Sequence, residues 1–150
     1  MLIVDYQSKS YYHFLNDLPQ IANHKTRFLI TFNGANETDL AGAEADLFGH
    51  TKNNVQHATV ITDKATQEQV AELFKVARDT RQIIMPENAD PLFDKKTAVK
   101  NSHERDSAFD INSLFKNIAQ HNGIVVLSTD QKQTLNASIS TKMDVLVRFK

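Results

Sequence analysis

The sequence predicts a three-layer α/β protein in which helices cover both faces of a mostly parallel sheet of five strands. Short apolar, β-branched runs alternate along the chain with segments whose apolar residues recur at helical spacing. One apolar run, Gly123 to Leu127, begins at a glycine directly after an amphipathic segment, as buried strands of parallel sheets do. Such alternation favours parallel strands joined by right-handed crossovers.

The N-terminal third supplies the first expected elements. Leu2-Ile3-Val4 is either a short strand or an anchor for the fold. Apolar residues at helical spacing from Tyr11 to Ile21 predict a helix that Pro19 splits or kinks. A buried strand is expected at 28–32, followed by a turn and by a helix from Leu40 to Phe48 that ends at Gly49.

Further strands are expected at 58–62, 82–86, 123–128 and 144–149. A helix after residue 66 follows the first of these, and Thr66 to Gln69 fits a capping box. A second amphipathic helix spans Phe109 to Gln120. The side chains expected to be almost fully buried are Phe74, Leu114, Ile118, Val125 and Val126.

Composition describes an ordinary globular chain that fits a single domain over residues 1–150. Hydrophobic residues make up 41% and charged residues 23%, and the net charge of −1 gives no global attraction to nucleic acid or membrane. The absence of cysteine excludes disulfides and thiolate metal sites. No apolar run approaches the ~18 residues that span a bilayer, and no signal peptide is evident, so we expect a cytoplasmic protein.

The second half carries a specific series of matches to a known family. They are Leu92-Phe93, Lys95-Lys96, Val99-Lys100, Ser102-His103, Glu104-Arg105, Gly123 to Leu127, Thr129 and Asp144 to Phe149. Over 92–149 the chain resembles the AAA+ ATPase module, most closely that of small bacterial AAA+ ATPases such as those found with contractile injection systems. The resemblance implies a P-loop-type sheet in which the strand at 28–32 lies between those at 123–128 and 144–149. It also implies that the helical lid, which the family begins near position 150, is lacking.

The position of the phosphate-binding loop departs from this family. A Walker A motif, G-x-x-x-x-G-K-[ST], holds phosphates with glycine-rich backbone N–H groups and a lysine. The equivalent turn here contains Asn33 and Gly34, and it has Glu37, Thr38 and Asp39 where the lysine and the magnesium-binding hydroxyl belong. A pair of unit charges 4 Å apart interacts by about 4 kcal/mol at an effective dielectric constant of about 20, so these carboxylates oppose a bound triphosphate.

The other nucleotide-site positions are altered as well. In the degenerate Walker B motif, Glu87 takes the metal-binding position and Asn88 replaces the general base, and an amide cannot accept a proton from water. Asp130 replaces the sensor asparagine. Thr141 and Lys142 replace the arginine finger, and Lys142 lacks the bidentate fork. The resemblance therefore implies a pseudo-ATPase with no bound cofactor and no catalytic residue.

A polar loop and six histidines complete the candidates. Two groups in the polar loop form a candidate interaction loop. His103, Glu104 and Arg105 match the stretch near the central pore of the ring in relatives, with a solvated loop as the alternative. Lys95, Lys96 and Lys100 form a small basic cluster that favours a solvated loop over anion binding. The histidines show no paired-ligand spacing, so no metal site is expected; they are His13, His24, His50, His57, His103 and His121.

Three functions fit these observations. The first is an inactive AAA+-like domain that acts by protein–protein contact, with an active AAA+ ATPase or its client as the partner. The second is a weak ATP-binding protein that uses Glu87 for metal and Lys95 or Lys96 for phosphate. The third is a small mobile-element or phage protein that reuses the fold for an unrelated ligand. The fold itself does not select among them.

Overall fold

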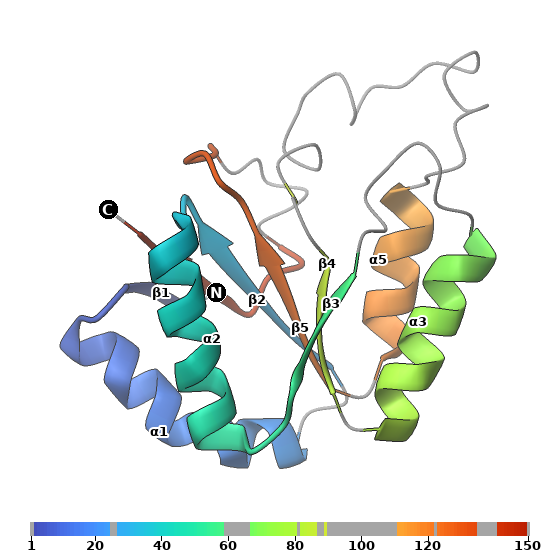
Figure 1. Cartoon of the computed structure of the whole chain (residues 1–150), viewed down its shortest axis with the longest axis horizontal. Coiled ribbons are helices and arrows are strands. Elements are labelled where there is room, and N and C mark those ends of the chain that lie inside the picture. Colours follow the sequence, from blue (N-terminus) through green and yellow to red (C-terminus); the bar gives the residue numbers. More distant parts are fainter. Residues whose placement is uncertain are drawn as a thin grey trace.

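The computed structural model describes residues 2–24, 27–58, 67–80, 82–86, 89, 111–121, 123–134 and 141–149. Within this part of the chain, one sheet has the strand order β1-β6-β2-β5-β4-β3, and all its pairs are parallel (Figure 1). The strands are β1 (Leu2–Asp5), β2 (Arg27–Asn33), β3 (Val55–Ala58), β4 (Ile83–Pro86), β5 (Gly123–Ser128) and β6 (Val145–Arg148).

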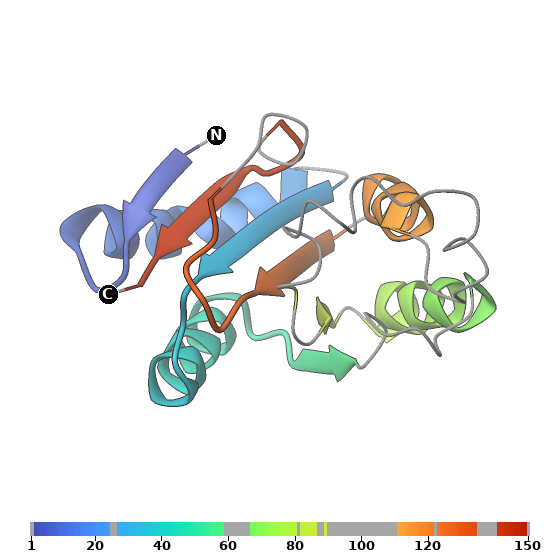
Figure 2. The ribbon, with the colours of Figure 1, turned by 90° about the horizontal axis from the view of Figure 1, so that it is seen from above.

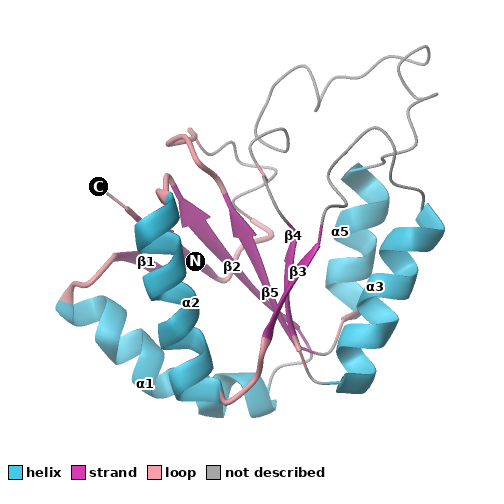
Figure 3. Cartoon of the chain, viewed as in Figure 1, coloured by secondary structure: helices cyan, strands magenta, loops and turns pink. Residues whose placement is uncertain are grey.

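Helices cover both faces of this sheet, so the three-layer α/β prediction is confirmed (Figure 2). On one face, α1 (Lys9–His24) and α2 (Glu37–Thr51) share a buried apolar cluster with the sheet. On the other face, α3 (Gln67–Thr80) and α5 (Ile111–Gln120) form a second cluster, and Figure 3 shows these two helices side by side. No helix in the described ranges has the length and apolar character that a bilayer crossing requires.

The centre of the sheet agrees with the sequence. Strand β2 lies between β5 and β6, and the register pairs Phe32 with Ser128 and with Val147. All five predicted core side chains are buried, with exposed fractions from 0% for Leu114 and Val126 to 5% for Phe74. The apolar runs of β2 and β5 are buried on both faces, which explains why they lack an alternating pattern.

The predicted number of five strands is wrong, because the described chain forms six. Leu2-Ile3-Val4, for which a strand and an anchor were both open, belongs to β1 at one edge of the sheet. The Leu2 N–H donates to the Asp144 carbonyl at 3.0 Å and the Tyr6 N–H to the Arg148 carbonyl at 2.9 Å. Only Val4 of this strand is buried, so the apolar signal was short.

Strand β3 begins earlier than expected. The prediction placed it at 58–62, whereas it runs from Val55 to Ala58, and residues 59–62 lie outside the described part. It is an edge strand that pairs only with β4 among the described strands. Gln56 and His57 are tolerated in it because an edge strand needs little apolar surface, so no apolar run marked its start.

The helix bounds on the first face also differ from expectation. Of the two effects expected at Pro19, a split does not occur, because α1 continues through this residue to His24. Helix α2 was expected from Leu40 to Phe48 with its end at Gly49, but it spans Glu37 to Thr51. Its end is formed by Lys52, which adopts the left-handed conformation at φ 61° and donates its N–H to the Phe48 carbonyl at 2.8 Å. A lysine in this position carries no sequence signal of a helix end.

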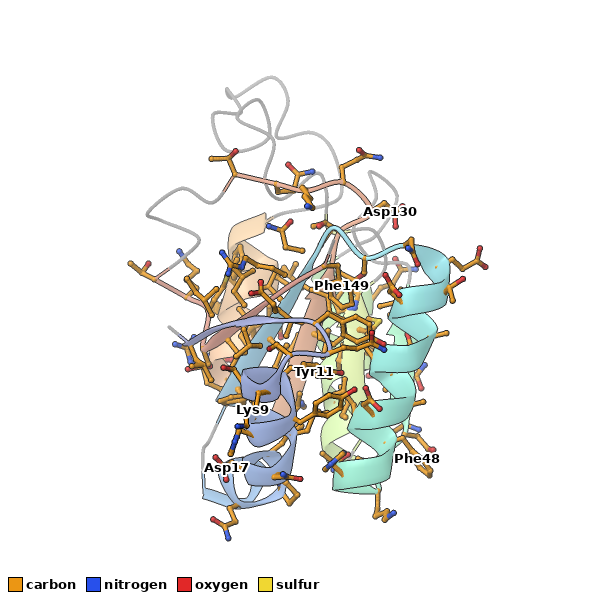
Figure 4. All side chains as sticks on the ribbon, turned by 90° about the vertical axis from the view of Figure 1, so that its left-hand side faces the viewer. Lys9, Tyr11, Asp17, Phe48, Asp130 and Phe149 are labelled. Atoms are coloured by element: carbon orange, nitrogen blue, oxygen red, sulfur yellow. The ribbon has the colours of Figure 1, made fainter. Side chains whose placement is uncertain are left out.

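A buried tyrosine ties α1 to α2. Tyr11 is 1% exposed, and its hydroxyl donates to Oδ2 of Asp46 at 2.8 Å; Figure 4 shows Tyr11 between the two helices. Its ring meets Tyr6 edge-on with 5.2 Å between centroids, and Tyr6 stacks on Phe149 at 4.6 Å. Burial raises the pKa of Tyr11 above its usual value, and the hydrogen bond to the Asp46 carboxylate adds to this rise.

Because the folded-state pKa of Tyr11 is raised, its stabilising contribution is present below the unfolded pKa of about 10 and is lost at higher pH. We expect the free energy of unfolding to fall above about pH 10. Tyr11→Phe removes the hydrogen bond to Asp46, so its free energy of unfolding should be about 1 kcal/mol lower than that of the wild type at neutral pH. Above about pH 10 the free energy of unfolding of Tyr11→Phe should fall less steeply than that of the wild type. Urea unfolding of both proteins across this range measures the difference, and parallel pH curves would contradict the assignment.

Candidate functional site

The candidate site lies at the carboxyl ends of β2 and β5, where ligands bind in open parallel α/β sheets. Strand β2 ends at Asn33, Gly34 follows with φ +77°, and α2 begins at Glu37. Strand β5 ends at Ser128 beside Phe32, so the segment that follows it, Thr129 to Gln133, runs next to this turn. Figure 4 places Asp130 above the carboxyl ends of the strands.

Asn33, Thr129 and Gln133 hold this turn closed, and we name the three residues the clasp. The Asn33 side chain pairs with the Gln133 backbone: its Nδ2 donates to the Gln133 carbonyl at 3.1 Å, and its Oδ1 accepts from the Gln133 N–H at 2.8 Å. The Thr129 hydroxyl lies 3.3 Å from the same Oδ1. A side-chain amide matched in both directions to a backbone fixes the segment rigidly over the turn.

The clasp also engages the backbone donors of the turn. The Gly34 N–H donates to the Thr129 hydroxyl at 3.0 Å, and the Ala35 N–H donates to the Thr129 carbonyl at 3.0 Å. Thr129 is fully buried, and its own N–H donates to the Phe32 carbonyl at 3.0 Å. Backbone N–H groups at such a turn are the groups that hold phosphate in nucleotide-binding loops. Here two of them are bonded to the protein itself.

A lysine side chain lies against the one glycine of the turn. A Cβ placed on Gly34 would stand 2.6 Å from Cγ of Lys132 and 3.4 Å from its Cα. A glycine in a phosphate loop permits close approach of the ligand, whereas Gly34 permits close approach of Lys132. Lys132 thus covers the turn with its aliphatic stem.

The start of α2 carries its own polar partners. The Asn36 side chain accepts from the Asp39 N–H at 2.8 Å, which is an N-cap bond. Glu37 and Asp39 place two carboxylates in the first turn, where they favour the positive end of the helix dipole. Glu37 and Thr38 are exposed and Asp39 is half-buried. These groups stabilise the helix and leave little positive potential for an anion.

The two residues at the predicted finger position, Thr141 and Lys142, precede β6. Asp144, two residues after Lys142, donates its N–H to the Leu29 carbonyl at 2.9 Å, in the first half of β2 and away from the clasp at its carboxyl end. The Lys142 Nζ stands 5.2 Å from the centre of the Phe115 ring on α5, a cation–π contact. The structure therefore brings Asn33, Gly34 and the first turn of α2 close to the segment that carries Asp130, but not to Thr141 or Lys142.

Other predicted residues fall outside the described part of the chain. They are Glu87, Asn88, Lys95, Lys96, Lys100, His103, Glu104 and Arg105. Ala89, which the structure describes, donates its N–H to the Ser128 carbonyl at 2.9 Å, so Ala89 lies beside the end of β5. Within the described ranges, no three His, Asp or Glu side chains gather closely enough to hold a metal.

Sequence reasoning missed the roles of Thr129, Lys132 and Gln133. Thr129 matched the family pattern, but its hydroxyl was not connected to the turn after β2. A polar residue directly after each of two neighbouring buried strands was the available signal, since parallel neighbours end at the same edge. Gln133 contributes through its backbone, which leaves no mark in the sequence.

Comparison with known proteins adds evidence on the fold. No family model matches the chain, and no curated protein matches it. A chain of the E. coli MS115-1 HORMA:CdnC:Trip13 complex is 13% identical with a TM-score of 0.54, and the match covers 94% of this chain and 54% of that one. C. elegans PCH-2 is 14% identical with a TM-score of 0.57, and the match covers 93% of this chain and 42% of that one. The chain spans about half the length of these structures, and at such identities the likeness shows a shared α/β fold alone.

Proposed function

We propose that this chain is an AAA+-like domain that has lost ATP binding and hydrolysis and acts by contact with a partner protein. The observation that carries the proposal is the clasp: the backbone donors of Gly34 and Ala35 are bonded to Thr129 rather than open to a phosphate. The strand order, with β2 between β5 and β6, is the order that the AAA+ resemblance implies, and it supports the relationship.

Binding a triphosphate at this turn would cost several favourable interactions. Two hydrogen bonds to Thr129 would have to break, each with a net value of about 0.5–1.5 kcal/mol. The carboxylates of Glu37 and Asp39 would then face the phosphates, and no lysine of the turn would offset them. Each term alone could be compensated, but together they oppose the usual ATP pose.

The proposed loss of hydrolysis rests on the altered sequence positions. Asn88 at the base position cannot accept a proton from the attacking water. Lys142, at the position where the family has an arginine finger, contacts Phe115. An enzyme without base, finger and phosphate loop lacks each of the groups that position and stabilise the transferred phosphoryl group.

The proposed partner is a protein, and we favour an active AAA+ ATPase or a client of one. One similar structure is a chain of a HORMA:CdnC:Trip13 complex, so the same fold occurs in a multi-protein assembly there. A domain whose sheet is packed on both faces, and which does not bind nucleotide, would act through contacts made by its surface. We infer the partner class by analogy of fold, and a binding experiment with such a protein tests it.

We expect no heat of binding when magnesium-ATP is titrated into the purified protein, and no phosphate release. Asn88→Glu, which restores the base, should also show no turnover, because binding would still be absent. Calorimetry on the wild type, followed by a phosphate-release assay on both proteins, makes the measurement. Micromolar binding by the wild type, or turnover that Asn88→Glu accelerates, would contradict the proposal.

One observation favours weak nucleotide binding as the second candidate. The stem of Lys132, in the segment after β5, lies against Gly34, so a lysine stands beside a turn that has no lysine of its own. If Lys132 served the phosphates, ATP with magnesium would raise the thermal unfolding midpoint of the wild type. The same ligand would leave Lys132→Ala unchanged. Absence of a shift in both proteins favours the interaction domain.

A further inference from the structure

We infer that Asn33 is a site of spontaneous deamidation whose rate is controlled by opening of the clasp. Asn33 is followed by Gly34. Because glycine has no Cβ to hinder the approach, its backbone nitrogen can attack the side chain of the preceding residue. The inference concerns covalent chemistry of the turn and does not depend on whether the chain binds ATP.

The reaction needs only water. The Gly34 backbone nitrogen, after losing its proton to solvent, attacks Cγ of Asn33; a C–N bond forms, the bond from Cγ to Nδ2 breaks, and Nδ2 leaves as ammonia with a proton from water. Water then opens the resulting succinimide at either carbonyl. The products are aspartate or isoaspartate at position 33, and no electron is transferred.

The clasp blocks both reacting groups in the folded protein. The Gly34 N–H donates to the Thr129 hydroxyl at 3.0 Å, so the nucleophile is already bonded. The carboxamide of Asn33 is held by the Gln133 N–H at 2.8 Å and by the Gln133 carbonyl at 3.1 Å. The Asn33 carbonyl accepts from the Phe149 N–H at 3.1 Å, which restrains the backbone rotation that ring closure requires. Deamidation must therefore wait for local opening.

The product cannot restore the same contacts. An aspartate at position 33 would present an acceptor oxygen to the Gln133 carbonyl in place of the Nδ2 donor, and two acceptors form no hydrogen bond. It would also add a negative charge to a turn that is followed by Glu37 and Asp39 in the first turn of α2. Each deamidation event thus leaves the clasp weakened, and the modified fraction records the time that the turn has spent open.

The test follows deamidation by peptide mass spectrometry during incubation of the full chain at mildly alkaline pH. Thr129→Val removes the hydroxyl that accepts from Gly34, and Thr129→Ser retains it. We expect Thr129→Val to convert Asn33 roughly three- to tenfold faster than wild type, as the loss of about one hydrogen bond predicts. Thr129→Ser should stay close to wild type.

The second Asn-Gly pair, Asn122-Gly123, provides an internal reference in the same digest. If Thr129→Val accelerated both pairs equally, global unfolding would account for the effect, and control by the clasp would be refuted. Equal Asn33 rates in wild type and Thr129→Val would refute it too.

A comparison within the wild type needs no variant to fold. The Asn33 rate in the native chain should be at least about tenfold below its rate in urea, because the native turn must first open. Equal rates in the two conditions would overturn the inference, and titration of ATP as described above would remain a separate test of the proposed function.

Discussion

Truncating Leu114 to alanine should lower the free energy of unfolding by about 2–5 kcal/mol. Leu114 is 0% exposed and lies on the face of α5 that packs on the sheet, in the cluster that includes Ile118 and Val125. Removing its isobutyl group loses the transfer free energy of the buried carbons and leaves a cavity that a packed α/β core fills only in part. Urea unfolding followed by circular dichroism measures the change.

Lys116 provides the matched control on the same helix. It is exposed, so Lys116→Ala should change stability by no more than about 0.5 kcal/mol. A cost below about 1 kcal/mol for Leu114→Ala would mean that Leu114 is not in the core. That outcome would also remove the basis on which α5 is placed against the sheet.

The centre of the fold could be predicted because burial on both faces leaves a strong sequence signal. The run from Gly123 to Leu127 is apolar throughout, and the run at 28–32 is apolar except for the buried Thr31; they became the neighbouring strands β5 and β2. The apolar residues of α3 face the core at helical spacing, with Val70, Phe74 and Ala77 buried and Leu73 partly buried.

The edges of the sheet were harder to predict because an edge strand needs few apolar residues. Only Val4 of β1 is buried, and β3 contains the polar residues Gln56 and His57. Tertiary pairing decides both strands: β1 is fixed by its ladder to β6, and β3 by its ladder to β4. The end of α2 at Lys52 was also hard to predict from the sequence. The left-handed conformation that Lys52 adopts there is usually adopted by glycine.

The candidate site could be located from the sequence, but its internal bonds could not. The turn at Asn33 and Gly34 was recognised by its position after a buried strand and by its departure from the Walker A pattern. The partner of that turn, Thr129, is distant in sequence and acts through one hydroxyl and its backbone. Such contacts depend on the register between β2 and β5, which the chain establishes only on folding.

Replacing Gly34 with alanine should destabilise the protein by about 2–4 kcal/mol, for two separable reasons. The backbone of Gly34 is at φ +77°, where an L side chain is strained. The new Cβ would also lie 2.6 Å from Cγ of Lys132, so Lys132 would have to move. If the space above Gly34 served only a phosphate, the clash with Lys132 would not arise in the protein without ligand.

A double-mutant cycle separates the two costs. Lys132→Ala removes the contacting Cγ and, because Lys132 is exposed, should have little effect alone. In the Gly34→Ala background it should recover about 1–2 kcal/mol, which is the coupling between the two side chains, while the backbone strain remains. The measured quantity is the free energy of unfolding of the four proteins in urea.

Gly49→Ala is the matched control for the same substitution. Gly49 lies inside α2, and a Cβ there would meet nothing within 4 Å, so alanine should stabilise the helix by about 0.5–1 kcal/mol. Opposite signs at Gly34 and Gly49 are therefore expected from one chemical change. If Gly34→Ala were neutral, or if Lys132→Ala failed to rescue it, Lys132 would not be packed on the turn. The turn at Gly34 would then lack the contact with Lys132 that distinguishes it from an open phosphate loop.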